Sequence, residues 1–378
     1  MDDKVKKNIF KIVIIGIILA ITITALLLIF PLQTQSDKDG FLIACILTLT
    51  GSGESMGYDM QDGLLLAAKE INAWGGINGK PVRLIIKDSG SSPEQAADVF
   101  REIESEHKPL LYISNMSSVA LALAPLAKEY EVTLMGLITS TEKLTVQNKW
   151  SFRYWTSAES EAKPILEIIS MLGIENLGIL YIKDEYGNSV FNHIIIKYNS
   201  SGGTSENYNF APQTIDFTDY IEKLNNTECI LLIGFPPHAI NIIQQLRESE
   251  YAGEIIITNC ASHPDIRSIP ESDGIYIPAP LVYKNDFLYA KEHTDSFEEE
   301  YNRPFNHFAA NSYDFIKILT FVLGGKSINR ITIREELESG FVFPGIFGEI
   351  KVERGSRDFS FDNYPAKIEN GEIIFLEY

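Results

Sequence analysis

The chain has 378 residues, of which 45% are hydrophobic and 22% charged, and it carries a formal net charge of −19. Its length suits two domains better than one, because a single hydrophobic core stops growing at about 250–300 residues. The strong acidity argues against a nucleic-acid-binding protein and against attraction to an anionic membrane surface.

The N-terminal segment predicts a membrane anchor. Residues 12–30 form an uncharged apolar run of nineteen residues, preceded by four lysines. A membrane-spanning helix needs about 20 apolar residues, and lysines before it favour a cytoplasmic N-terminus. No A-x-A cleavage site follows the run. We therefore predict that residues 1–36 are a signal anchor and spacer, with a single span in the cell membrane and the bulk of the chain extracytoplasmic. Cleavage near Gln35 is the alternative.

From residue 41 onward, strand patterns alternate with helix patterns. In a first series, strands are expected at 41–49, 82–89, 110–114 and 132–138, with helices at 60–74, 92–106 and from 117. In a second series, helices are expected at 159–172, 186–198, 217–225 and 238–249, with strands at 176–182, 206–211, 229–235 and 254–258. The tail adds helices at 289–301 and 308–323 and strands at 346–352, 366–369 and 373–376. Such alternation predicts an α/β fold of two doubly wound, Rossmann-like lobes with parallel sheets.

Motifs for catalysis, metals and cofactors are weak. Gly51, Gly53 and Gly57 follow the first strand, where a dinucleotide-binding turn would lie, but their spacing is a variant and Glu54 would repel a pyrophosphate. The histidines form no H-E-x-x-H or H-x-x-x-H pair, and no G-x-S-x-G or P-loop motif is present. We therefore predict a protein that is not an enzyme and that uses no metal or cofactor.

One strand-to-helix junction, in "LYISNMSSVALALAPLAKEY", carries two hydroxyls at the start of a helix, Ser117 and Ser118. Either serine could be the N-cap, which satisfies free backbone N–H groups and contributes about 1 kcal/mol. A helix N-terminus with free hydroxyls is also suited to a phosphate or a carboxylate. The motif alone leaves both interpretations open.

A longer motif resembles a known family. The stretch "LTGSGESMGYDMQDGLLLAAKEINAWGGINGKPVRLIIKDSGSSPEQAA" is similar to the opening of type I periplasmic binding proteins, in the leucine/isoleucine/valine-binding branch of ABC-importer receptors. The resemblance extends over about residues 41–378. It implies two lobes joined by a hinge that the chain crosses three times, with a ligand cleft between them. Lobe 1 would comprise 40–156 plus 280–345, and lobe 2 would comprise 157–279 plus 346–378.

The resemblance also implies site residues. In the amino-acid receptors of this family, the helix-start serine binds the ligand carboxylate. That position falls on Ser117, after Met116, and the next loop supplies Thr139 and Ser140. Tyr186 fits an aromatic contact from lobe 2.

Other positions depart from the family pattern. Met56 replaces a first-turn aromatic residue, and Pro236 stands where a tyrosine is expected. Asn259 or Cys260 stands where the family has the acid that binds the ligand ammonium. Either Asp265 substitutes for that acid, or the ligand is a small carboxylate, an amide or an aromatic acid.

The resemblance implies an extracytoplasmic solute-binding receptor of an ABC importer, which binds a small carboxylate-bearing ligand by lobe closure. Its expected partners are that ligand, the permease subunits and the membrane through residues 12–30, and no nucleic acid. The alternative is the ligand-sensing ectodomain of a signalling or scaffold assembly without transport, because a fold does not fix a function.

Overall fold

The computed structural model describes residues 40–283 and 288–376. The chain divides into Met1–Gly40 and a second unit, Phe41–Tyr378, which contains every element below. The predicted membrane span, residues 12–30, lies outside the described residues. Among the helices that are described, none is long and apolar enough to cross a membrane.

Lobe 1 is built on a six-stranded sheet in the order β13-β5-β4-β3-β1-β2, and all of its strand pairs are parallel. Its strands are β1 (Phe41–Leu47), β2 (Val82–Asp88), β3 (Leu111–Ser114), β4 (Thr133–Leu137), β5 (Ser151–Tyr154) and β13 (Asp358–Phe359). Strand β3 and strand β4 are buried along their whole length. Continuous apolar strands of this kind indicate a parallel sheet covered by helices on both faces.

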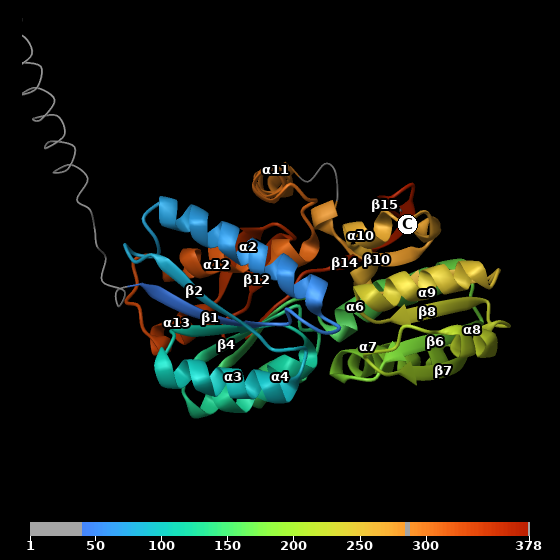
Figure 1. The fold of residues 1–378 in the computed structure, drawn as a ribbon, viewed down its shortest axis with the longest axis horizontal. Helices are drawn as coiled ribbons and strands as arrows, with labels where there is room; N and C mark the ends of the chain where they lie inside the picture. Colours follow the sequence, from blue (N-terminus) through green and yellow to red (C-terminus); the bar gives the residue numbers. More distant parts are fainter. Residues whose placement is uncertain (1–39, 284–287, 377–378) are drawn as a thin grey trace, which may run out of the picture. The chain divides into compact units, whose positions relative to one another are not determined.

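Helices cover the two faces of this sheet in Figure 1, with α2 and α12 on one face and α3 and α4 on the other. The helices of lobe 1 are α2 (Glu54–Ala73), α3 (Pro93–Glu106), α4 (Ser117–Glu129), α5 (Lys143–Gln147), α11 (Leu288–Tyr301), α12 (His307–Leu323) and α13 (Arg330–Leu337). At Gly63 the backbones of α2 and α12 approach so closely that a Cβ atom would lie 2.2 Å from the carbonyl oxygen of Ala309. Gly63 therefore permits this helix pairing. A two-stranded hairpin, β11 (Phe341–Gly345) with β12 (Gly348–Val352), completes the lobe.

Lobe 2 is built on a seven-stranded sheet in the order β15-β14-β10-β9-β8-β6-β7. Its strands are β6 (Asn176–Ile182), β7 (Thr204–Phe210), β8 (Cys229–Ile233), β9 (Glu254–Ile257), β10 (Tyr276–Pro280), β14 (Asn363–Glu369) and β15 (Glu372–Phe375). Its helices are α6 (Ala158–Leu172), α7 (Glu185–Ser200), α8 (Thr218–Leu224), α9 (Pro236–Glu248) and α10 (Pro264–Arg267). Strand β14 pairs antiparallel with β10 and β15, whereas the other pairs are parallel. The two predicted α/β lobes are confirmed.

The chain passes between the two sheets three times, and the last passage lies later than expected. It falls between β13 and β14, because β13 pairs with β5 in the sheet of lobe 1. We expected the chain to return to lobe 2 at residue 346, and this boundary is wrong. Residues 346–359 belong to lobe 1. Arg153 of β5 is fully buried and forms an ion pair with Asp358 of β13. This pairing keeps β13 at the edge of lobe 1, because a buried guanidinium needs a carboxylate partner.

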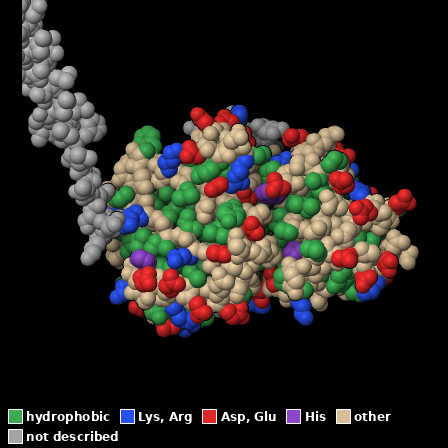
Figure 2. Space-filling view, viewed as in Figure 1, with side chains coloured by type: hydrophobic (Ala, Val, Ile, Leu, Met, Phe, Trp, Pro, Cys, Tyr) green, Lys and Arg blue, Asp and Glu red, His purple; other side chains and the backbone are tan. Residues whose placement is uncertain are grey.

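Acidic side chains are spread over both lobes on the face drawn in Figure 2, and Lys and Arg side chains lie among them. This distribution agrees with the net charge of −19. On this face the acids form no single block that would indicate a docking site for a basic partner.

Candidate functional site

A pocket lies between the two lobes, at the carboxyl ends of both sets of strands. It encloses about 310 Å³ of unfilled space, its open mouth included. Only about 20 Å³ of it can hold the centre of a water molecule, so the lobes leave this pocket nearly closed. Its lining residues are Met56, Met116, Ser117, Ile138, Ser140, Trp155 and Phe308 from lobe 1, and Tyr186, Gly234, Phe235, Asn259 and Cys260 from lobe 2.

The start of α4 forms the polar part of the lobe 1 wall. Neither serine at this junction is the N-cap, because Met116 occupies that position and makes no side-chain capping hydrogen bond. The Ser117 hydroxyl instead accepts a hydrogen bond from the Thr141 backbone N–H, at 3.4 Å. The N-terminus of α4 therefore points bare N–H groups and a hydroxyl toward the pocket, which is the usual arrangement for binding an anion.

Two lining residues adopt a left-handed backbone. Met116 has φ 62° and ψ 134°, and Ile138 has φ 48°. Such conformations are rare for bulky side chains and cost about 1–3 kcal/mol each. Both residues follow neighbouring strands of lobe 1, β3 and β4. Strain of this kind concentrates at ligand sites, where the surrounding structure holds it in place.

The lobe 2 wall is aromatic and conceals a carboxyl group. The ring of Tyr186 stacks on Phe235 at 5.4 Å between centroids, with an angle of 20° between the rings. The Tyr186 hydroxyl donates to Glu161 Oε1 at 3.1 Å, and the Asn259 backbone N–H donates to the same oxygen at 3.3 Å. From lobe 1, the Ser140 hydroxyl donates to Glu161 Oε2 at 3.5 Å. Three groups that line the pocket therefore converge on one acid.

Burial of Glu161 raises the pKa of its carboxyl to about 7, although hydrogen bonds from Asn259, Tyr186 and Ser140 act in the opposite direction. Beside it, the side-chain amide nitrogen of Asn259 is buried and has no hydrogen-bond partner. An unpartnered buried donor costs about 1–3 kcal/mol, so a ligand oxygen that accepts from Asn259 would remove this cost.

Seven of the nine predicted site residues line the pocket: Met56, Met116, Ser117, Ser140, Tyr186, Asn259 and Cys260. The other two do not. The Thr139 hydroxyl turns back to the Leu137 carbonyl at 3.1 Å. Pro236 begins α9, and the aromatic side chain expected there comes from the preceding residue, Phe235.

Asp265 also lies outside this pocket. Its side chain is 73% exposed, with a carboxylate oxygen 3.7 Å from Nδ1 of His263. The acid beside the pocket is instead Glu161, which the sequence analysis did not single out.

Two polar seams join the lobes beside the pocket. In the first, which we call the His263 seam, Nε2 of His263 in lobe 2 lies 2.9 Å from Oδ2 of Asp59 in α2. Because Nδ1 accepts a hydrogen bond from the Asp265 backbone N–H, Nε2 carries the proton and donates to Asp59. Arg303 of lobe 1 also bonds Asp59, which gives this buried carboxylate a cation partner.

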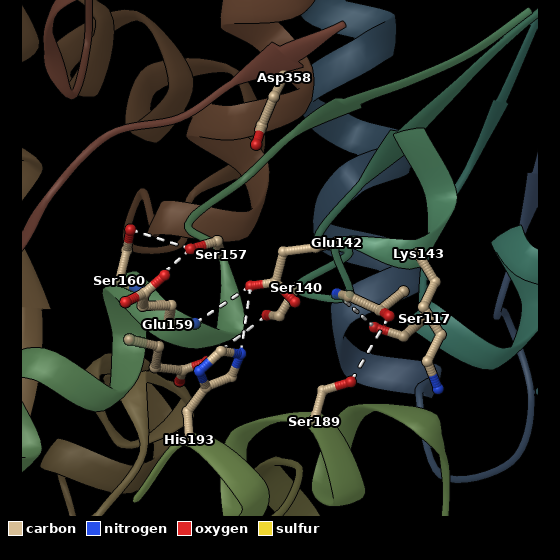
Figure 3. A network of polar contacts seen from close by, with 12 residues as sticks. Ser117, Ser140, Glu142, Lys143, Ser157, Glu159, Ser160, Ser189, His193 and Asp358 are labelled. Atoms are coloured by element: carbon tan, nitrogen blue, oxygen red, sulfur yellow. Dashed lines mark hydrogen bonds and ion pairs between the residues drawn. The ribbon is translucent and has the colours of Figure 1, made fainter. Parts of the chain in front are cut away.

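The second seam, the Glu185 seam, joins α7 to the loop before α5. Glu185 accepts from the Thr141 hydroxyl at 3.0 Å and pairs with Lys143 at 2.8 Å. From α7, the Ser189 hydroxyl donates to the Thr141 hydroxyl at 3.5 Å, and Figure 3 shows His193 pointing toward Glu142, 3.8 Å away. With the pocket residues, the two seams hold the lobes in contact.

This architecture, a pocket walled by two α/β lobes at the carboxyl ends of their strands, defines the class of two-lobed ligand-binding proteins. The sequence profile of the periplasmic binding protein family matches residues 42–372. The chain therefore belongs to the type I periplasmic binding proteins, in the branch of the leucine/isoleucine/valine-binding proteins. Members of this family are ligand-binding receptors rather than enzymes.

Individual relatives are distant. The amino acid binding protein of Pseudomonas aeruginosa is 24% identical over 207 residues, which cover 53% of this chain and 55% of that protein. The chain thus spans about half the length of this curated relative.

Two solved structures share the fold. The branched-chain amino acid transporter substrate-binding protein LivJ of Streptococcus pneumoniae, in complex with isoleucine, has a TM-score of 0.80 at 21% identity, covering 88% of this chain and 97% of that one. A solute-binding protein of an ABC transporter from Rhodopseudomonas palustris, in complex with benzoate, has a TM-score of 0.82 at 16% identity, covering 89% and 95%. At these identities the likeness shows the fold alone.

Proposed function

We propose that this protein is the extracytoplasmic receptor of an ABC importer and that it captures a small carboxylate-bearing solute by closing its two lobes. The observation that carries this proposal is the pocket itself, whose walls come from both lobes. A ligand held by both walls stabilises the closed arrangement, because it contacts both lobes only when they meet. The names of the solved neighbours, an amino-acid receptor and a benzoate receptor, support a small ligand that carries a carboxylate.

The ligand carboxylate is assigned to the start of α4. Bare N–H groups and the hydroxyl of Ser117 lie there, and the hydroxyl of Ser140 lies in the next loop of the same wall. A helix N-terminus favours a negative charge by about 0.3–1 kcal/mol at an exposed site and by up to about 2 kcal/mol when it is partly buried. Ser117 is 1% exposed and therefore belongs to the stronger case.

The remaining parts of the proposal concern location and partners. Residues 12–30 would anchor the chain in the cell membrane, and the permease subunits of the importer would receive the solute from the closed receptor. The apolar, uncharged run after four lysines supports the anchor. The family supports an importer as the partner, because its members include receptors of ABC transporters.

The test is ligand binding by the full chain in a lipid nanodisc. Calorimetry against amino acids and small carboxylates should find a ligand, and Ser117→Ala should weaken its binding about tenfold through loss of a hydrogen bond to a charged group. Ser118→Ala is the matched control, because Ser118 is the next residue of α4 and does not line the pocket. If no member of the panel binds, the receptor function is wrong. Loss of solute uptake in cells that lack the protein would support import, whereas binding without any uptake defect would favour the sensing alternative.

A further inference from the structure

We propose that Trp74 docks on the membrane surface and holds the end of lobe 1 opposite the pocket against the lipid headgroups. This inference rests on the anchor in the proposed function, residues 12–30, and goes beyond it by naming the surface of the folded part that contacts the bilayer. Three observations carry it: the exposure of one tryptophan, its position in the fold and the short spacer beside it.

Trp74 is the most exposed large hydrophobic side chain among the described residues, at 90%. The other two tryptophans of the chain, Trp150 and Trp155, are 3% and 2% exposed. An aromatic side chain carries about 150–250 Å² of largely apolar surface, so leaving it in water is unfavourable. Single exposed apolar residues are common on protein surfaces, so the position of Trp74 decides what it does.

Trp74 lies at the end of lobe 1 that faces away from the pocket. It directly follows α2, whose first turn carries the pocket residue Met56, and the 20 residues of this helix span about 30 Å. In Figure 1, α2 runs from the side of lobe 2 to the far end of lobe 1. Strand β1 begins at the same end, where the Phe41 backbone N–H donates to the Pro81 carbonyl at 2.7 Å. The described chain therefore starts beside the loop that carries Trp74.

The loop after α2 presents Trp74 on a fixed backbone. Ile77 and Lys80 exchange two backbone hydrogen bonds across it, at 2.9 and 3.0 Å. Ile77 is 1% exposed, so it packs the base of the loop into the core. The Asn78 side-chain amide donates to the Leu323 carbonyl at the end of α12, at 2.7 Å. The fold therefore holds the tryptophan outside the core.

The neighbours of Trp74 in this loop are small or polar. Asn78 and Lys80 are exposed, and two glycines follow the tryptophan. Tryptophan and lysine are typical of the membrane–water interface, where the ring lies at the depth of the headgroups and the ammonium reaches phosphate. A protein partner would instead bury about 800 Å² on each side, around several large apolar residues. This loop exposes one, which favours lipid as the partner.

The spacer makes even a weak contact with the membrane effective. Residues 31–40 join the proposed anchor to β1, and ten residues span at most about 33–36 Å. The start of β1 would therefore stay within that distance of the bilayer surface. Binding through a short linker is intramolecular, with an effective concentration on the order of millimolar, so a single tryptophan suffices to populate the contact.

Docking at this end gives the receptor a resting orientation. Because the pocket lies at the opposite end of α2, it stays in the aqueous phase, where the solute enters. A permease is embedded in the membrane, so delivery of the solute would need Trp74 to leave the lipid.

The experiment uses the native tryptophans of the full chain in lipid nanodiscs. The lipids are brominated near the top of their acyl chains, because bromine quenches tryptophan fluorescence only at short range. Subtracting the emission of Trp74→Phe from that of the unaltered protein gives the emission of Trp74. This emission should fall to about half or less in brominated nanodiscs, because an interfacial ring lies against the upper acyl chains. The emission of Trp150 and Trp155, which remains in Trp74→Phe, should not change, because both rings are buried.

A matched variant separates docking from random collision with lipid. Ile196 of α7, in lobe 2, is 69% exposed. In the double variant Trp74→Phe with Ile196→Trp, the introduced ring is also exposed and should keep its full fluorescence in brominated nanodiscs. Both substitutions are at exposed positions and should leave the melting temperature unchanged.

The outcomes separate this inference from the receptor function. Unquenched emission of Trp74 would overturn the inference, and so would equal quenching of the ring introduced at position 196. Protection of Trp74 from aqueous iodide, without quenching by brominated lipid, would indicate a protein contact and would also overturn it. These results leave the receptor function intact. If the chain does not enter nanodiscs, the anchor fails and this inference fails with it, whereas ligand binding by the same chain still tests the receptor function.

Discussion

Asp314 is a buried acid at the junction of α12 with β5. Its Oδ2 accepts from the Tyr154 hydroxyl at 2.5 Å and from the Ile346 backbone N–H at 3.2 Å. Burial raises the pKa of this carboxyl to about 7, against the smaller opposing effects of Tyr154, Ile346 and Lys317. The folded protein therefore binds the Asp314 proton more tightly than the unfolded chain does.

This difference in proton binding makes the stability of the protein depend on pH. Between pH 4 and pH 7 the folded state retains a proton that the unfolded chain has released, so the free energy of unfolding falls as the pH rises through this window. The fall is on the order of 1.4 kcal/mol for each pH unit. We expect Asp314→Asn to remove this contribution, so that the free energy of unfolding depends less on pH. Relative to the unaltered protein, the variant should gain most stability above pH 7. Urea unfolding at pH 5 and pH 8 measures the effect, and Asp98→Asn, at an exposed position of α3, is the control. If Asp314→Asn changed the free energy of unfolding equally at both pH values, the prediction would be wrong.

At the scale of elements, the pairing of α2 with α12 depends on Gly63. A methyl group there would lie 2.2 Å from the Ala309 carbonyl and 2.4 Å from the Ser312 hydroxyl. Alanine is favoured over glycine inside a helix by about 1 kcal/mol, but forcing two packed helices apart costs about 1–3 kcal/mol or more. We therefore expect Gly63→Ala to lower the stability of the protein, measured by thermal unfolding.

The matched control is Gly324→Ala, at the end of α12. A Cβ atom there meets only the Phe321 and Thr320 carbonyls, at 3.4 and 3.8 Å, and the backbone has φ −51°. This substitution should leave the melting temperature unchanged. A fall that matched the effect of Gly63→Ala would show that close helix approach at Gly63 is not the cause.

The long elements could be predicted from the sequence, because apolar runs and helical periodicity are strong signals. The short strands β5 and β13 could not. The sequence Ser151–Tyr154 contains an arginine, and β13 is only two residues long and pairs across about 200 residues of chain. Their pairing is supported by the ion pair of the buried Arg153 with Asp358, which no local pattern reveals.

The candidate site was only partly predictable for a similar reason. The serine at the start of α4 follows a clear strand-to-helix junction, and the lobe 2 loops follow clear strands. The sequence analysis did not single out Glu161, although the spacing of Ala158, Glu161, Ala162 and Ile165 places it on the apolar face of α6. That spacing was the available signal. Asp265 is the converse case. It lies near the expected position of the ligand-binding acid in the sequence, but its side chain faces solvent in the fold.

For the whole molecule, the His263 seam outside the pocket holds the lobes in contact. The His263 and Asp59 side chains are 5% and 4% exposed and lie on different lobes. We expect His263→Ala to favour separated lobes and to weaken every ligand by the same factor, about tenfold. The reason is that the closed arrangement, which binds the ligand from both sides, becomes less populated.

The readout distinguishes this effect from a change of specificity. Leucine and 4-methylpentanoate should weaken in proportion if both bind, and small-angle scattering of the ligand-free protein should show a larger radius of gyration. His107→Ala, which removes an exposed histidine within lobe 1, is the control. Unchanged affinity together with an unchanged radius would mean that the seam does not bias closure.

The burial of the cysteines offers a way to measure how often the lobes open. Cys45 and Cys229 lie inside strands β1 and β8, whereas Cys260 lies on the pocket wall, where burial raises its pKa to about 12. A thiol reagent attacks only the thiolate, so Cys260 is inert while the lobes are in contact. Each opening would return Cys260 to water and to an ordinary acidity, while the other two thiols stay enclosed. If the reagent reacts faster than the lobes close again, the rate at which a single label appears would equal the rate of opening of the native chain, without any engineered probe.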